Sequence, residues 1–176
     1  MKIGLCGTMS VGKTTLVNAL QKLPQFKDYN FATERSKYLS DLGIPLNTDS
    51  TLKGQTIFLA ESCAELIQTD IITDRTIVDV MALTMNAKSI HHQDKELFET
   101  YASEFIREYD YIFYISPYGL KIEDNGVRET DEHYRDLIDF TITTLIKRYG
   151  HRCNVVEKIS GSTEERIQQI LNITGL

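Results

Sequence analysis

The sequence lacks several features that would mark a specialised class of protein. Its 176 residues include 3 cysteines, 3 prolines and no tryptophan. The cysteines (Cys6, Cys63 and Cys153) are too widely spaced for a zinc motif and too few for a disulfide framework, so we expect free, buried thiols in a reducing compartment. No run of 18 uncharged apolar residues is present, which argues against a membrane span, and the first ten residues hold no signal-peptide hydrophobic segment.

Positive charge is also in short supply. The chain has 19 Lys and Arg against 25 Asp and Glu, a net charge of −6. That balance argues against a protein whose main task is to hold nucleic acid through its phosphates, although a local basic cleft is still compatible with it. The hydrophobic content of 41% is typical of globular chains, and we expect one domain over residues 1–176.

Short apolar runs alternate with helical periodicities along the chain. The predicted strands are residues 2–6, 29–32, 70–73, 111–115 and 154–157. The predicted helices are residues 16–23, 36–42, 55–69, 77–88, 94–109, 134–149 and 163–171, with polar loops at 47–53 and 116–129. This alternation predicts an α/β fold: a five-stranded parallel sheet with helices on both faces, whose ligands bind at the carboxyl ends of the strands.

One segment carries a specific chemical signature. Residues 7–14 (GTMSVGKT) match the pattern G-x-x-x-x-G-K-[ST] and stand between a predicted strand and a predicted helix. Gly7 allows a sharp turn off the strand, and Gly12 allows the backbone to approach a phosphate closely. The amides of this loop, Ser10 and Val11 among them, together with the following helix N-terminus, are expected to hold a β-phosphate.

The end of the same motif predicts the cofactors. Lys13 is expected to reach the β- and γ-phosphate oxygens, and the hydroxyl of Thr14 to ligate Mg²⁺. Thr15 either contacts the α-phosphate or lies on the helix surface. The motif therefore predicts that the protein binds ATP together with Mg²⁺.

A second group of candidate residues follows the third predicted strand. Asp74 can hold Mg²⁺ through water, or it can simply cap the next helix. Arg75 can bind an acceptor phosphate or the transferring phosphate, or it can be a solvated arginine. Asp79 lies four residues further on, where a structural pair with Arg75 is expected.

Charged residues follow the second predicted strand as well. Glu34 can accept a proton from an acceptor hydroxyl or orient that hydroxyl, and Arg35 lies beside it. The alternative for Glu34 is a favourable interaction with a helix N-terminus.

The polar loop after the fourth strand is expected to form a lid at about residues 116–130. Arg128 in this loop, and Arg135 two helical turns later, would place positive charge over the triphosphate and exclude water. Ser160 follows the last strand and is expected to lie beside the adenine. A turn or a helix cap is the structural alternative for Ser160.

Taken together, these residues resemble a known group of enzymes. The chain is similar to small P-loop kinases of the nucleoside and nucleotide kinase group, in particular the nicotinamide riboside kinase domain of bifunctional NAD-biosynthesis regulators and related phage kinases. The resemblance rests on residues 7–14, 34–36, 123–128 and 161–166 and on Asp74. The Asp74-Arg75 pair is more similar to that of thymidylate and deoxynucleoside kinases.

The resemblance implies ATP-dependent transfer of the γ-phosphate to a nucleoside- or nucleotide-type acceptor. Two alternatives stay open: a phage DNA-modification kinase acting on a 5-hydroxymethyl pyrimidine in DNA, and a nucleotide-dependent switch or adaptor with slow hydrolysis. The expected partners are ATP and a small acceptor, or hydroxymethylated DNA, with no membrane; a homodimer also stays open. We expect a cytoplasmic protein, in the host cytoplasm if a phage encodes it.

Overall fold

Five short strands form one parallel sheet in the computed structural model, which describes residues 1–33, 35–45, 47–120 and 131–176. The strands are β1 (Lys2–Cys6), β2 (Asn30–Ala32), β3 (Ile71–Asp74), β4 (Tyr111–Ile115) and β5 (Val155–Ile159), in the spatial order β2-β3-β1-β4-β5. All neighbouring strands are parallel, so their carboxyl ends meet at one edge of the sheet. The predicted α/β class is confirmed.

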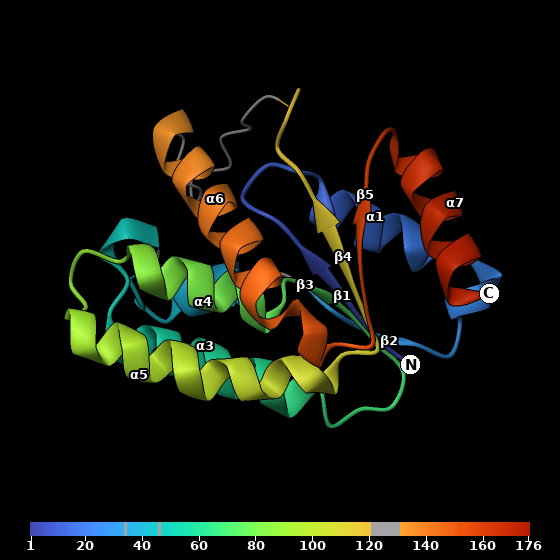
Figure 1. Ribbon diagram of the computed structural model, residues 1–176. Helices are drawn as coiled ribbons and strands as arrows, with labels where there is room; N and C mark the ends of the chain where they lie inside the picture. The colour runs from blue at the N-terminus through green and yellow to red at the C-terminus, as the bar shows by residue number, and fades with distance from the viewer. Residues whose placement is uncertain (34, 46, 121–130) are drawn as a thin grey trace.

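Helices cover both faces of the sheet, as Figure 1 shows. Helices α1 (Lys13–Leu20) and α7 (Thr163–Thr174) lie on one face. The other face carries α3 (Leu52–Glu65), α4 (Ile77–Asn86), α5 (His92–Ser103) and α6 (Glu132–Tyr149). The short helix α2 (Arg35–Asp41) follows β2.

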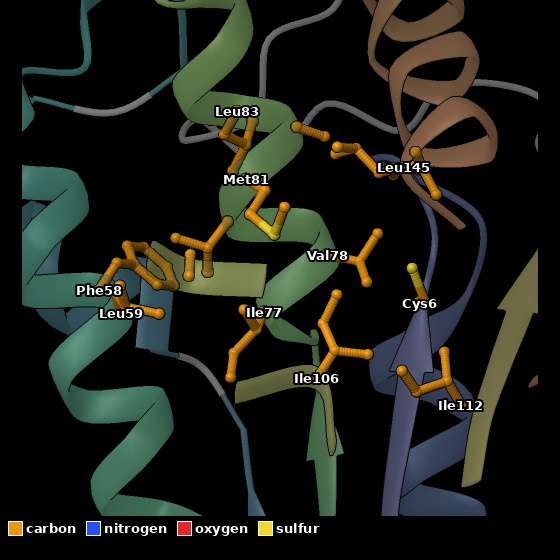
Figure 2. Close-up of a cluster of buried hydrophobic side chains, with 14 of the residues drawn as sticks. Cys6, Phe58, Leu59, Ile77, Val78, Met81, Leu83, Ile106, Ile112 and Leu145 are labelled. Carbon is orange, nitrogen blue, oxygen red and sulfur yellow. The ribbon is translucent and has the colours of Figure 1, made fainter. Parts of the chain in front are cut away.

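Each face has its own buried core because successive strand residues point in opposite directions. In β1, Ile3 and Leu5 join the cluster under α1 and α7, whereas Cys6 joins the cluster under α3 to α6. Figure 2 shows the second cluster, where Val78 and Met81 of α4 lie among side chains from the sheet and the neighbouring helices. Residues 77–84 of α4 are all buried, which is typical of a helix enclosed on every side.

Several element ends differ from the prediction. Helix α3 begins at Leu52 instead of residue 55, because the Thr51 hydroxyl caps it by accepting the Gly54 N–H at 3.1 Å, and it ends at Glu65 instead of 69. The helix predicted over 94–109 is α5 followed by a separate 3-10 helix, Glu104–Glu108. Strand β5 occupies Val155–Ile159 instead of 154–157.

The three cysteines form no disulfide with one another; Cys6 and Cys153 are buried as predicted, whereas Cys63 is partly exposed. None of the described helices is both long enough and apolar enough to cross a bilayer.

The close approach of β1 to the start of α4 gives a test of the packing. A Cβ atom on Gly4 would lie 2.5 Å from Cγ2 of Thr76 and 2.9 Å from Cε1 of Tyr109. The substitution Gly4→Ala should therefore lower the free energy of unfolding by about 1–3 kcal/mol, measured by urea denaturation. The control is Gly150→Ala, whose added Cβ would lie an ordinary 3.5 Å from Cγ2 of Ile146. Equal stability of the two variants would contradict this packing.

Candidate functional site

The segment that joins β1 to α1 adopts the conformation its glycines predict. Gly7 has φ +151° and Gly12 has φ +84°, and Ser10 also has a positive φ of 59°. A Cβ on Gly7 would lie 2.5 Å from the carbonyl oxygen of Ile115 on the neighbouring strand, so a side chain is excluded there. Helix α1 begins at Lys13, so its unpaired N-terminal N–H groups lie next to this loop. These are the elements of an anion-binding loop.

Lys13 lies across this loop and is buried at 6% exposure. Its ammonium donates hydrogen bonds to the carbonyl oxygens of Gly7 and Thr8. An ammonium has three N–H donors, so these two contacts leave one for a ligand. Burial lowers the pKa of Lys13, and the nearby negative charge of Asp79 opposes that shift.

Thr14 and Asp74 are brought together, as the sequence predicts for a metal site. The Thr14 hydroxyl donates a short hydrogen bond to Oδ2 of Asp74. The register of the sheet explains the contact, because Leu5 of β1 pairs with Asp74 at the end of β3. The described residues contain no cluster of three or more His, Cys, Asp or Glu side chains suited to a metal ion. Two oxygen ligands fit Mg²⁺, which in phosphate sites is held by few protein groups, with phosphate and water completing its shell.

The turn after Asp74 is strained. Arg75 has φ +122°, a conformation that non-glycine residues rarely adopt, and such strain is concentrated at functional sites. Asp79 holds Thr76, the residue after Arg75. Its Oδ2 accepts hydrogen bonds from the backbone N–H and the hydroxyl of Thr76, both at 2.7 Å. Its Oδ1 accepts the N–H of Gly7 at 3.0 Å. Asp79 therefore has the structural role that was expected, but with Gly7 and Thr76 as partners in place of the predicted Arg75.

Arg135 lies next to the loop at the start of α6, but its side chain makes a contact that the sequence did not predict. It is 9% exposed, and its Nη1 donates to the carbonyl oxygen of Leu120 at 2.8 Å. Its own carbonyl oxygen accepts the Thr8 hydroxyl at 3.3 Å. Arg135 thus links the phosphate-loop region to the segment that leaves β4.

Two other candidates lie at the periphery of the loop. Thr15 is exposed on α1, consistent with the helix-surface alternative. Ser160 is exposed after β5, where its backbone N–H donates to Gln169 Oε1 at 3.3 Å and its carbonyl accepts from Gln169 Nε2 at 2.8 Å. These bonds fix a turn before α7, which is the structural alternative expected for Ser160.

The remaining candidates fall outside the described part of the chain. Glu34 and Arg128 are not among the described residues, and neither is the side chain of Arg35. The predicted lid is described only as far as Leu120, because residues 121–130 are likewise outside the described ranges.

Sequence reasoning missed Arg166 in the first turns of α7. It is 7% exposed, and its Nη1 donates to the carbonyl oxygen of Val11 at 2.8 Å. The same Nη1 would lie 3.3 Å from a Cβ added to Gly12. Burial lowers the pKa of Arg166. Arg166 lies in the helix predicted over 163–171 and in the segment 161–166 of the resemblance, but neither assigned it a role, because its contact with Val11 spans 155 residues.

Comparisons with known proteins agree with this architecture. A family model described as an AAA domain matches residues 2–166, and no curated protein sequence matches the chain. The structure is similar to deoxyadenosine kinase from M. mycoides with bound dCTP, with a TM-score of 0.67, 19% identity and 99% of both chains covered.

Two further solved structures are similar. NadR protein in complex with NR gives a TM-score of 0.76 and 17% identity over 99% of this chain and 51% of that chain, so this chain spans about half of its length. YorR protein from Bacillus subtilis in complex with phosphorylated GDP has a TM-score of 0.61 and 14% sequence identity, with 99% of this chain and 95% of that chain covered. At these identities the likeness shows the fold, and the predicted resemblance to P-loop nucleoside and nucleotide kinases is confirmed at that level.

The contact of Arg166 with the loop can be tested directly. Arg166→Met should leave the Val11 carbonyl unpaired, lower the free energy of unfolding by about 1–3 kcal/mol, and speed amide hydrogen exchange in the loop. Arg107→Ala is the control, since Arg107 is exposed and pairs with Glu104 on the surface. Arg107→Ala should lower the free energy of unfolding by at most about 1 kcal/mol. Unchanged loop exchange in Arg166→Met would refute the contact.

Proposed function

The chain belongs to the AAA domain family, and we propose that it is an ATP-dependent kinase that transfers the γ-phosphate to a nucleoside- or nucleotide-type acceptor. The observation that carries the proposal is the hydrogen bond between Thr14 and Asp74 beside the buried ammonium of Lys13. This pairing joins a phosphate loop to a carboxylate that can position a metal ion, which is the donor site of phosphoryl-transfer enzymes.

The donor side of the reaction rests on charge and backbone amides. The amides of the loop, including Ser10 and Val11, bind the β-phosphate, and Lys13 donates its remaining N–H to a phosphate oxygen. Thr14 and Asp74 would hold Mg²⁺, which when bound neutralises charge on the phosphates. Little covalent chemistry is required of the protein, because catalysis of this transfer is mainly positioning and electrostatic stabilisation.

Two of the remaining donor candidates have supporting roles. We assign Arg128 to the lid, where its positive charge would approach the transferred group, and Arg135 to the anchoring of the lid's first segment through the carbonyl oxygen of Leu120. Arg135 also lies close to the loop, since its backbone carbonyl oxygen accepts the Thr8 hydroxyl. Thr15 is exposed on the surface of α1 and Ser160 fixes the turn before α7, so neither is given a role in ATP binding.

The acceptor binds at the carboxyl ends of β2 and β3, where Glu34 and Arg75 lie in the chain. A hydroxyl oxygen of the acceptor attacks the γ-phosphorus and forms a new P–O bond. The bond from that phosphorus to the β–γ bridging oxygen breaks, and ADP leaves with its electron pair. Glu34 takes the hydroxyl proton, and Arg75 binds either the transferred phosphoryl group or a phosphate on the acceptor.

Two observations favour a small acceptor over a DNA strand. The cavity at the end of β2, about 360 Å³ in volume, has an acidic lining that includes Glu61 and Glu65, and the chain carries a net charge of −6. Both would repel a DNA backbone. The similar structures also support this choice, because the small molecules bound in them are dCTP, NR and a phosphorylated GDP.

The role of Lys13 tests the proposed function. Lys13→Ala should lower the rate of phosphoryl transfer from γ-labelled ATP to a mixture of nucleosides and nucleotides by about 10²–10³-fold, because the transferred group loses its nearest cation. Lys22→Ala is the control: it removes an exposed lysine just after the same helix and should leave the rate unchanged. Near wild-type transfer by a folded Lys13→Ala protein would refute the assignment.

A further inference from the structure

The carboxylate of Asp79 closes a ring of interactions around the site. Asp79 is 2% exposed and lies in the enclosed helix α4. Its Oδ1 accepts the N–H of Gly7, whose carbonyl oxygen in turn accepts from Lys13. Its Oδ2 accepts the N–H and the hydroxyl of Thr76, the first residue after the strained Arg75.

The ring is completed on its other side. Lys13 is followed in the chain by Thr14, whose hydroxyl donates to Asp74. Asp74 and Arg75 then lead directly to Thr76 and back to Asp79. The four side chains to which we assign contact with phosphate or metal in these two segments, Lys13, Thr14, Asp74 and Arg75, all lie on this ring.

We propose that Asp79 is a positioning residue, which locks the phosphate loop to the Asp74-Arg75 turn and so fixes the spacing of Lys13 and Asp74 for phosphoryl transfer. The inference rests on the proposed kinase function and adds a residue that touches neither nucleotide nor acceptor. It assigns a reaction-linked role to a carboxylate that would otherwise be only a helix cap.

The hydrogen bonds of Asp79 require a side chain with two acceptor oxygens. Three hydrogen-bond donors from two segments 69 residues apart (Gly7 and Thr76) converge on two acceptor oxygens. An asparagine at this position has one acceptor oxygen and an NH₂ group in place of the two acceptor oxygens. Its NH₂ group would therefore face the backbone N–H of either Gly7 or Thr76, and two donors would meet. The buried thiol of Cys6, the residue before Gly7, also interacts with Thr76 and Asp79, but the Gly7 amide itself is held by Asp79. The loop and the turn would then shift relative to each other.

Such a shift should appear in the turnover number more than in ATP binding. The loop amides and Lys13 remain in Asp79→Asn, so ground-state binding of ATP is largely retained. The alignment of the γ-phosphate with the acceptor depends on the relative position of both loops, and a misplacement of about 1 Å can cost about 10²-fold in rate. We therefore expect kcat to fall by about 10–100-fold and the KM for ATP to change by less than about threefold.

The control is a carboxylate of the same kind away from the site. Glu99 of α5 is 7% exposed and accepts hydrogen bonds from Arg148 at 2.6 Å and Tyr149 at 2.9 Å. Its partners lie at the end of α6 that leads into β5, and so at the amino-terminal edge of the sheet. Glu99→Gln should lower the melting temperature, as any damaged buried hydrogen-bond network does, and leave kcat unchanged.

The experiment measures kcat and KM for ATP in the full-length protein by transfer of labelled phosphate and by basal Mg²⁺-dependent hydrolysis, together with the melting temperature. A fall in kcat in Asp79→Asn with little change in KM, absent from Glu99→Gln, supports the proposal. Wild-type kcat in Asp79→Asn, or a rise in KM alone, would overturn it.

A second variant, Asp79→Ser, tests the same proposal if Asp79→Asn does not fold. Asp79→Ser has a single oxygen on a shorter side chain, so it can bond at most to Thr76, the N-cap residue of α4, and loses the bond to Gly7. It should show the same split between kcat and KM, and an unchanged kcat would overturn the proposal. A wild-type protein that neither transfers phosphate nor hydrolyses ATP would refute the proposed function itself, and the role of Asp79 in transfer would fall with it.

Discussion

The buried ammonium of Lys13 is the group around which the site is built. An ammonium removed from water is costly unless it is hydrogen-bonded and matched by negative charge. Two carbonyl oxygens of its own loop accept its N–H groups, and the carboxylates of Asp74 and Asp79 lie near enough to favour its charged form. These groups come from the loop after β1, the end of β3 and the start of α4, so the charged site exists only when those three elements are correctly placed.

The order of the sheet and the burial of α4 meet that requirement. Strand β1 lies between β3 and β4, which sets Asp74 beside the loop on one side and the carbonyl of Ile115 against Gly7 on the other. Helix α4 is enclosed by apolar side chains, as seen in Figure 2, so the capping carboxylate of Asp79 has a rigid support. Arg166 holds the loop from the opposite face of the sheet through the carbonyl of Val11. The phosphate loop is thus stabilised from both layers of helices.

Most of this architecture could be predicted from local pattern. The glycines at 7 and 12, the lysine and the threonine form a contiguous motif, and Asp74 was found because it ends an apolar strand. The sequence could not predict contacts between distant residues: the contact of Asp79 with Gly7 and the burial of Arg166 depend on three-dimensional packing across 72 and 155 residues. The end of α5 was predicted wrongly for a related reason, since the periodicity of residues 94–109 continues through a 3-10 helix that a helical pattern does not distinguish.

The most direct test is a screen for phosphoryl transfer. Purified protein with Mg²⁺ and γ-labelled ATP is incubated separately with nucleosides, nucleotides and hydroxymethylated duplex DNA, and the labelled products are resolved. The proposed function predicts Mg²⁺-dependent labelling of a free nucleoside or nucleotide. Label in the DNA alone would favour the DNA-modification alternative, and release of labelled phosphate without any labelled acceptor would favour the hydrolytic switch. Either result, or no consumption of ATP at all, would contradict a kinase acting on a small acceptor.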